Sequence, residues 1–201
     1  MRPTRILGDV VTRLVFVLLL GLGASGCTSV LFCPLPADDG TVEVLIAAMG
    51  ERLAVMPAVA EWKRRHNRPV VDPERENVVL DNGVEAARQA ALQAELPPFP
   101  EPAIRAFYRA QIDAAVTIQQ KLLARPASTA GPIPDLATEI RPALDRTGAR
   151  IAELLVRLPP RLDRQQVRAA AHEAWQIDGL DAPEIDRLVD ALVLLAGTRA
   201  P

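Results

Sequence analysis

Apolar residues recur along most of the chain with the three- and four-residue spacing of amphipathic helices. The stripes run from Leu45 to Ala60, Leu80 to Ala91, Ile104 to Leu122 and Ile140 to Leu158. This spacing places the apolar side chains on one face of each helix, whereas a strand alternates apolar and polar residues. The sequence shows no such alternation, and it is rich in alanine and leucine, which favour helices. The pattern predicts an all-α protein, a single-domain helical bundle of about six helices.

Proline and turn residues divide these stripes into separate helices. Pro57 lies inside the first stripe, where its ring and its missing N–H predict a kinked first helix. The second helix is expected to begin at Asp72 and to stop before a proline cluster, and a linker is expected over 125–134. We therefore divide the chain into a helical core at 41–125 and C-terminal helices at 135–201 that complete the same domain.

Two cations fall on the apolar stripe of the first helix. Arg52 and Lys63 are eleven residues apart, which is close to three turns and places them about 16 Å apart on one side of a helix. Asp72, Arg75 and Glu76 follow at positions i, i+3 and i+4 and share one face of the next helix. Charges at this spacing often form a solvated face closed by salt bridges, and Asp72 is also a good N-cap. Cations that point toward a core, however, require anionic partners.

Three segments carry the pattern of a known family. Arg52 and a leucine are followed by V-A-x-W-K, which ends at Lys63, and by V-x-D-x-x-R-E, which ends at Glu76. The third segment, F-Y-R-A-Q-I-D-A-A-V-T-I-Q, covers 107–119. In this order and spacing they resemble the all-helical class of chorismate mutases, in particular its exported, periplasmic subclass. The resemblance implies an isomerase that converts chorismate to prephenate by an intramolecular [3,3] rearrangement, without a nucleophile, cofactor or metal.

The resemblance also implies seven substrate-binding residues, namely Arg52, Lys63, Asp72, Arg75, Glu76, Gln119 and Arg150. Arg52 and Arg75 match positions that hold substrate carboxylates. Lys63 matches a lysine that contacts a carboxylate and the ether oxygen, and Gln119 matches the donor on the other side of that oxygen. Arg150 matches an arginine that the exported subclass takes from a later helix. Arg52, Lys63 and Gln119, together with one carboxylate described next, are expected to be catalytic.

Acidic and neutral positions complete the expected site. Glu76 matches an acceptor for the ring hydroxyl and is the fourth expected catalytic residue, and Asp72 matches a neighbouring acidic position that helps to hold the site. Ala115 stands where relatives commonly have serine, threonine or asparagine, so one neutral hydrogen bond to the substrate is missing or supplied elsewhere. Val79 replaces a residue that is polar in some members. Gln111 lies within the apolar stripe of its helix and needs a hydrogen-bond partner.

The composition excludes several other functions. The 201 residues are 49% hydrophobic and 3% aromatic, with a formal net charge of −2. Basic residues are spread along the chain, so a basic patch with stacking rings for nucleic acid is not expected. Cys27 and Cys33, with two histidines elsewhere, make a poor metal site, and we predict no metal. The implied partner is the small dianion chorismate, and because relatives are often dimeric, a homodimer is one further expectation.

The first 26 residues have the pattern of a signal peptide. Three arginines precede an apolar run that is too short to span a membrane comfortably, and small residues follow it. Ala24 to Cys27 resembles the lipobox of bacterial lipoproteins, although alanine replaces the usual leucine. We expect an exported protein whose mature chain begins at Cys27 and continues through a linker at 27–40. Cys27 is either lipidated, which tethers the protein to a membrane, or free to pair with Cys33.

Two other functions stay open from the sequence. An isochorismate–pyruvate lyase uses the same fold and nearly the same charged pocket. A helical envelope lipoprotein that binds a partner without catalysis is the second alternative. It would leave Arg52, Lys63 and Gln119 on apolar faces without a ligand, which is unfavourable. Assay of the mature protein with chorismate separates these alternatives.

Overall fold

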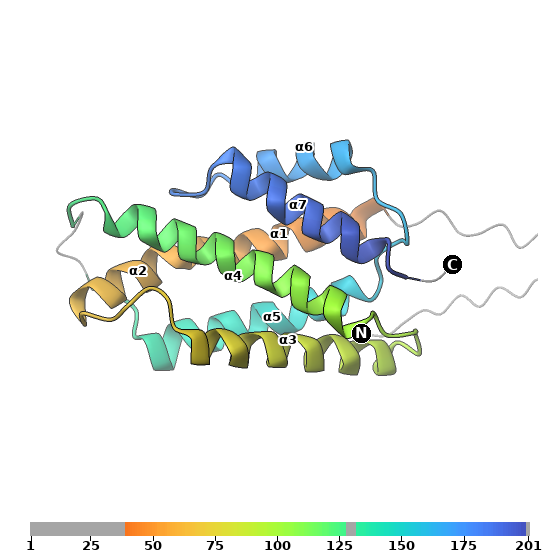
Figure 1. The fold of residues 1–201 in the computed structure, drawn as a ribbon, viewed down its shortest axis with the longest axis horizontal. Coiled ribbons are helices and arrows are strands. Elements are labelled where there is room, and N and C mark those ends of the chain that lie inside the picture. Colours follow the sequence, from red (N-terminus) through yellow and green to blue (C-terminus); the bar gives the residue numbers. More distant parts are fainter. Residues whose placement is uncertain (1–38, 128–131, 200–201) are drawn as a thin grey trace, which may run out of the picture. The chain divides into compact units, whose positions relative to one another are not determined.

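The computed structural model describes residues 39–127 and 132–199. These ranges contain seven α-helices and one short π-helix, and they contain no strand (Figure 1). The all-α prediction is therefore confirmed. The expected signal peptide, Cys27 and Cys33 lie outside the described residues. Within the described ranges, no helix is both long enough and apolar enough to cross a membrane.

The first helix is kinked, as the sequence predicts. α1 spans Asp39–Ala54 and α2 spans Met56–Arg65, with Val55 between them. Pro57 occupies the first turn of α2, where a missing N–H costs no intrahelical hydrogen bond. In an unbroken helix its ring would clash with the carbonyl of Leu53. With α1 and α2 counted as one bent helix, the described chain contains the six helices expected.

Two long helices follow, and both begin with proline in the first turn. α3 spans Pro73–Gln93 and α4 spans Glu101–Leu123. The carboxylate of Asp72 accepts a hydrogen bond from the backbone N–H of Arg75 at 3.1 Å. This bond satisfies one of the free N–H groups at the start of α3. Asp72 is therefore the N-cap of α3, as its position before Pro73 indicates.

The fourth apolar stripe divides into two elements. η1 spans Leu136–Ile140 and α5 spans Arg141–Leu155. Pro142 stands in the first turn of α5 and has no N–H to donate to the carbonyl of Thr138. The turn before it takes the wider π-helical form, which is typically a single turn next to an α-helix.

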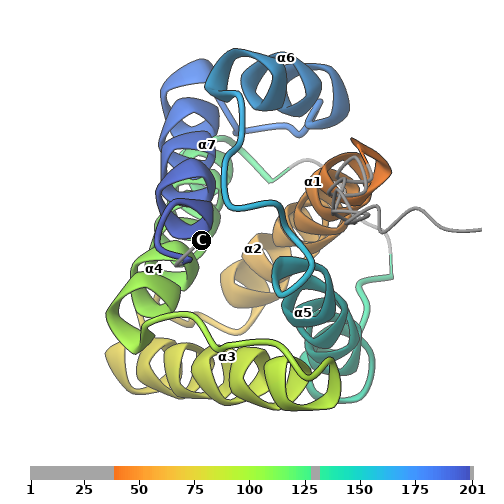
Figure 2. The same cartoon turned by 90° about the vertical axis from the view of Figure 1, so that its right-hand side faces the viewer.

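The last two helices complete the core. α6 spans Arg164–Ala174 and α7 spans Ala182–Ala196; α6 packs on α1 and α7, and α7 packs on α4 (Figure 2). Trp175, between them, is buried, and its indole N–H donates to the carbonyl of Ile46 at 2.7 Å. Gly50 makes room for this ring, since a Cβ at that position would lie 2.7 Å from Cδ1 of Trp175. The C-terminal helices thus share one hydrophobic core with α1 and α4.

The remaining packing positions the site. α4 lies against α2 and α3, and α5 lies against α1 and α3. In the end-on view of Figure 2, the helices follow one another around a ring in the order α4, α3, α5 and the α1–α2 pair. The inner faces of these helices carry the residues that the motifs single out.

Candidate active site

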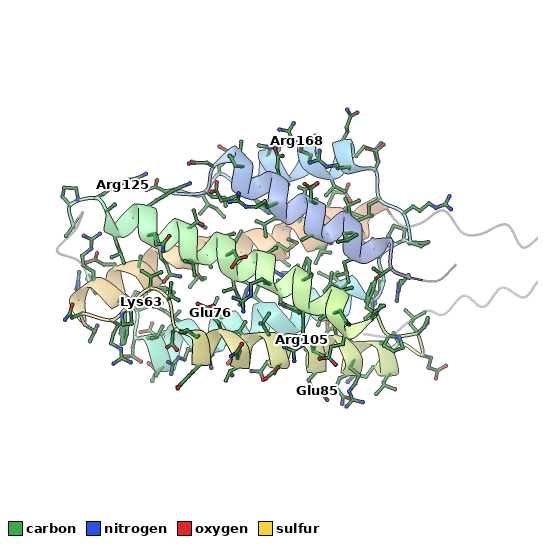
Figure 3. The ribbon with its side chains drawn as sticks, in the orientation of Figure 1. Lys63, Glu76, Glu85, Arg105, Arg125 and Arg168 are labelled. Atoms are coloured by element: carbon green, nitrogen blue, oxygen red, sulfur yellow. The ribbon has the colours of Figure 1, made fainter. Side chains whose placement is uncertain are left out.

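One cavity of about 380 Å³ lies among α1, α2, α3, α4 and α5. It is lined by six of the seven predicted site residues, namely Arg52, Lys63, Asp72, Arg75, Glu76 and Gln119. These residues span 68 positions of sequence, and the fold brings them to one space. In Figure 3, Lys63 and Glu76 are labelled near the connection between α2 and α3. Apolar side chains such as Val59, Val79 and Ile112 also line the cavity.

The charges around the cavity are predominantly positive. Five cationic side chains line it, namely Arg52, Lys63, Arg68, Arg75 and Arg141, and three carboxylates do, namely Asp72, Glu76 and Asp145. Five positive and three negative groups leave a net charge of +2 at neutral pH. A cavity with this balance favours a small dianion over a neutral or cationic ligand.

The two cations from the kinked helix each donate to a backbone carbonyl rather than to a carboxylate. Nη1 of Arg52 donates to the carbonyl of Leu144 at 3.5 Å, at the limit of a hydrogen bond, and no carboxylate in the described ranges forms an ion pair with Arg52. Burial lowers the pKa of Arg52, partly offset by the charges of Tyr108 and Asp145. Lys63 Nζ donates to the carbonyl of Val70 at 2.7 Å. Both cations therefore retain donors that an anionic ligand can use.

Burial disfavours the charged form of Lys63. Burial lowers the pKa of its ammonium, and the carboxylates of Asp72 and Glu76 partly offset this effect. A bound anion would restore the charge balance around the ammonium and raise its pKa again.

Glu76 is fixed by two hydrogen bonds. Its Oε2 accepts from Nη1 of Arg109 at 2.8 Å, and its Oε1 accepts from the backbone N–H of Asp72 at 3.3 Å. Arg109 extends from α4 to α3 and does not line the cavity itself. Reasoning from the sequence did not single out Arg109, although it lies inside the third matched segment. Only the packing of α4 against α3 relates it to Glu76.

The side-chain amide of Gln119 is hydrogen-bonded through its nitrogen but not through its oxygen. Its Nε2 donates to the carbonyl of Ala115 at 3.1 Å and contacts Sδ of Met56 at 3.5 Å, whereas Oε1 has no partner among the described residues. The side chain is 5% exposed, so the amide lies in apolar surroundings at the cavity wall. To donate to a ligand, Nε2 has to exchange its hydrogen bond to the Ala115 carbonyl for one to the ligand.

Gln111 differs from Gln119. It is buried, it does not line the cavity, and neither polar atom of its amide has a partner in the described ranges. The hydrogen-bond partner that Gln111 needs is therefore not found among the described residues.

Arg150 does not line the cavity, contrary to the sequence-based prediction. Its Nη1 lies 3.2 Å from both carboxylate oxygens of Glu51, and the side chain is 49% exposed. Arg141, nine residues earlier, lines the cavity instead. Nine residues correspond to two and a half turns, so the two arginines point to opposite sides of α5. Of these two arginines, the structure brings Arg141 rather than Arg150 to the cavity.

Several other cavity residues were not predicted. Arg68 and Asp145 add charge, Asn82 adds an amide on α3, and Tyr108 adds a phenol on α4. Val79 and Ala115, the two departures from the family pattern, do line the cavity. Helical spacing identifies α4 positions that share a face, but it does not tell whether that face meets a core or a cavity.

The fold and the cavity together define a helical protein whose candidate site is lined by more cations than carboxylates. Comparison with known proteins shows which family the chain resembles. Residues 43–120 match the family model described as chorismate mutase type II. This match covers the part of the chain from α1 to α4, which contributes most of the cavity lining.

Individual proteins that the chain resembles carry the name chorismate mutase as well. The chain is 36% identical over 110 residues to a monofunctional chorismate mutase of Enterobacter agglomerans, and this match covers 55% of the chain and 54% of the relative. The match thus spans about half the length of that relative.

Three crystal structures of similar fold are also found. A chorismate mutase of Burkholderia phymatum is 26% identical with a TM-score of 0.65, over 78% of this chain and 98% of that one. A chorismate mutase of Burkholderia thailandensis is 28% identical with a TM-score of 0.59, over 80% and 99%. A secreted chorismate mutase of Yersinia pestis, 19% identical with a TM-score of 0.62 over 74% and 94%, shares the fold.

Proposed function

We propose that the protein is a chorismate mutase, which converts chorismate to prephenate. The observation that carries this proposal is the single cavity that collects Arg52, Lys63, Arg75 and Gln119 from three separate segments of the chain. The reaction breaks one C–O bond and forms one C–C bond within the same molecule, and no proton has to be transferred. The protein therefore has to bind a dianion in its folded conformer and to stabilise charge on the departing ether oxygen.

The cations of the cavity suit the two carboxylates of such a substrate. Arg52, Arg75 and Arg141 approach from α1, α3 and α5, so carboxylates at separate points can each be held by a guanidinium. Holding both carboxylates selects the compact conformer in which the bond-forming carbons are close. Because guanidinium groups bind carboxylates through paired N–H donors, they also fix orientation.

Lys63 and Gln119 suit the ether oxygen. Both line the cavity, from α2 and α4, and both have N–H donors. In the transition state the C–O bond lengthens and negative charge builds on the oxygen, so preorganised donors stabilise this state more than the ground state. Glu76, held by Arg109, is the proposed acceptor of a hydrogen bond from the ring hydroxyl.

The test is an assay of the purified protein with chorismate. The reaction is monitored by the loss of the ultraviolet absorbance of chorismate, and the product is identified after acid treatment. Prephenate as the product supports the proposal. Pyruvate released from isochorismate, with chorismate unchanged, would identify the lyase instead. Binding without turnover of either compound would favour the non-catalytic alternative.

We also propose export. The arginine-rich start, the apolar run and the small residues before Cys27 support a signal peptide that is removed at that cysteine. Mass spectrometry of the mature protein from cells distinguishes a lipidated Cys27 from a free one. The homodimer stays a prediction, which sedimentation of the purified protein tests.

A further inference from the structure

Tyr108 contributes a buried hydroxyl that forms no hydrogen bond within the described residues. The residue lies on α4, lines the cavity and is 3% exposed. Its hydroxyl oxygen is shielded from solvent and has no hydrogen-bond partner in the described ranges. An unpaired buried hydroxyl is unfavourable, and phenylalanine would fill the same space without it. The hydroxyl therefore calls for a partner that is not part of the chain.

The ring of Tyr108 is held in place by packing. A Cβ at Gly83 of α3 would lie 2.6 Å from Cδ2 and Cε2 of the ring, so only glycine lets α3 approach so closely. Phe107 packs edge-on, with ring centroids 5.3 Å apart and an interplanar angle of 76°. Glycine inside a helix is itself unfavourable relative to alanine. The two helices are thus built around this ring, and its hydroxyl cannot readily swing to another position.

Arg52 lines the same cavity as Tyr108. The two side chains also influence each other electrostatically across this space. Burial raises the pKa of Tyr108 to about 12, with Arg52 opposing the change, so the hydroxyl remains a donor at any pH near neutrality. Arg52 is held only by its 3.5 Å contact with Leu144 among the described residues, which an incoming anion can displace.

The other apolar residues of α4 at the cavity cannot donate a side-chain hydrogen bond to a ligand. Ile112, Ala115 and Val116 line it without a side-chain donor, which leaves Tyr108 and Gln119 as the two donors of this helix in the site. Ala115 is the position where relatives commonly carry a neutral hydrogen-bonding side chain. The Tyr108 hydroxyl, a donor on the same face of α4, can compensate for the hydrogen bond that Ala115 cannot make.

We propose that the Tyr108 hydroxyl is a further substrate-binding group, which donates a hydrogen bond to the carboxylate that Arg52 binds. This inference rests on the proposed function, since it names a further contact with the same dianion. It assigns a role to a residue that no spacing in the sequence singles out.

The test compares Tyr108→Phe with the wild type, using a bicyclic dicarboxylate that copies the chair-like transition state. Calorimetry should show binding weakened by about tenfold or more, because one hydrogen bond to a charged group is lost, with a similar loss in kcat/KM for chorismate. Thermal unfolding should stay at or above the wild-type temperature, because the unpaired hydroxyl is removed. Equal affinity in the two proteins would overturn the inference.

Thr117→Val is the matched control. Thr117 lies on α4, its hydroxyl donates to the carbonyl of Asp113 at 2.9 Å, and it does not line the cavity. This variant should bind the dicarboxylate like the wild type. A loss equal to that of Tyr108→Phe would show a general effect on α4 and would overturn the inference.

The wild-type protein offers a direct reading as well, because Tyr108 is the single tyrosine of the chain. The Cζ resonance of ¹³C-tyrosine-labelled protein should shift when the dicarboxylate is added, and an unchanged resonance under saturating ligand overturns the inference. If the wild type binds the dicarboxylate but does not convert chorismate, the proposed function fails, while the Tyr108→Phe comparison still decides the role of the hydroxyl. If the wild type binds no dicarboxylate, both fail.

Discussion

Nη1 of Arg109 lies 2.8 Å from Oε2 of Glu76 and so joins α4 to α3 beside the cavity. One helical turn earlier, Arg105 makes a second link between these helices, with Nη2 2.6 Å from Oδ1 of Asp81. Glu76 lines the cavity, whereas neither Arg105 nor Asp81 does. Both ion pairs link α3 to α4, but only the Arg109–Glu76 pair holds a residue of the cavity. A comparison of the two arginines therefore tests whether Arg109 positions Glu76.

Arg109→Gln should lower kcat/KM for chorismate by about tenfold, because Glu76 loses a charge-assisted hydrogen bond and its fixed orientation. Arg105→Gln removes the other link between α3 and α4 and should leave kcat/KM near the wild-type value. Arg109→Lys should recover part of the loss. Steady-state kinetics of the three variants check this, and equal losses in Arg109→Gln and Arg105→Gln would show that both arginines act only through stability.

The two arginines of α5 give a second comparison. Arg141→Ala should weaken substrate binding and reduce kcat/KM by about tenfold or more, because a guanidinium at the cavity is lost. Arg150→Ala should change little, because an exposed pair such as Arg150–Glu51 contributes about 0–1 kcal/mol to stability. Steady-state kinetics of both variants decide between them. The reverse result would restore the sequence-based prediction for Arg150.

The rate should be nearly constant across the neutral and mildly acidic range and should fall on the alkaline side. Gln119 does not titrate, so no donor is lost as pH rises through neutrality. Lys63 is active in its charged form, and burial lowers its pKa below the ordinary value of 10.5, so the alkaline loss should begin earlier than for an exposed lysine. A pH profile of kcat/KM tests this. A collapse between pH 5 and 8 would mean that another group controls the reaction.

Gln119→Glu should convert the flat part of this profile into one that falls as pH rises. Only a protonated carboxylic acid can donate to the ether oxygen, so activity should survive on the acidic side alone. Gln119→Ala should be slow at every pH. Full activity of Gln119→Glu at pH 8 would show that Gln119 is not the donor.

Two glycines should respond to alanine in opposite directions. A Cβ at Gly148 of α5 meets no atom within 4 Å, so Gly148→Ala should raise the free energy of unfolding by about 0.5–1 kcal/mol. A Cβ at Gly50 would lie 2.7 Å from the buried ring of Trp175, so Gly50→Ala should lower that free energy by about 1–3 kcal/mol through overpacking. Urea unfolding of both variants measures this. A stabilised Gly50→Ala would contradict the packing described for Trp175.

The sequence predicted the helices well because their signals are local. Apolar spacing, the Asp72 cap and Pro57 act within a few residues, and the kink and the start of α3 follow from them. The position of Arg150 could not be settled in this way, because it depends on which side of α5 faces α1 and α3. The partners of Glu76 and the burial of Tyr108 likewise depend on how α3 and α4 meet.

The most direct test of the account compares the rate of chorismate conversion by the wild type with the rates of Arg52→Ala and Lys63→Ala. Both cations lie at the cavity without a described carboxylate in ion-pair contact. Each variant should therefore keep its helix content and lose about 100-fold or more in kcat/KM, since a donor to the transition state is removed. The account predicts prephenate formation by the wild type and this loss in both variants. Turnover in either variant at the wild-type rate, or no prephenate from the wild type, would contradict it.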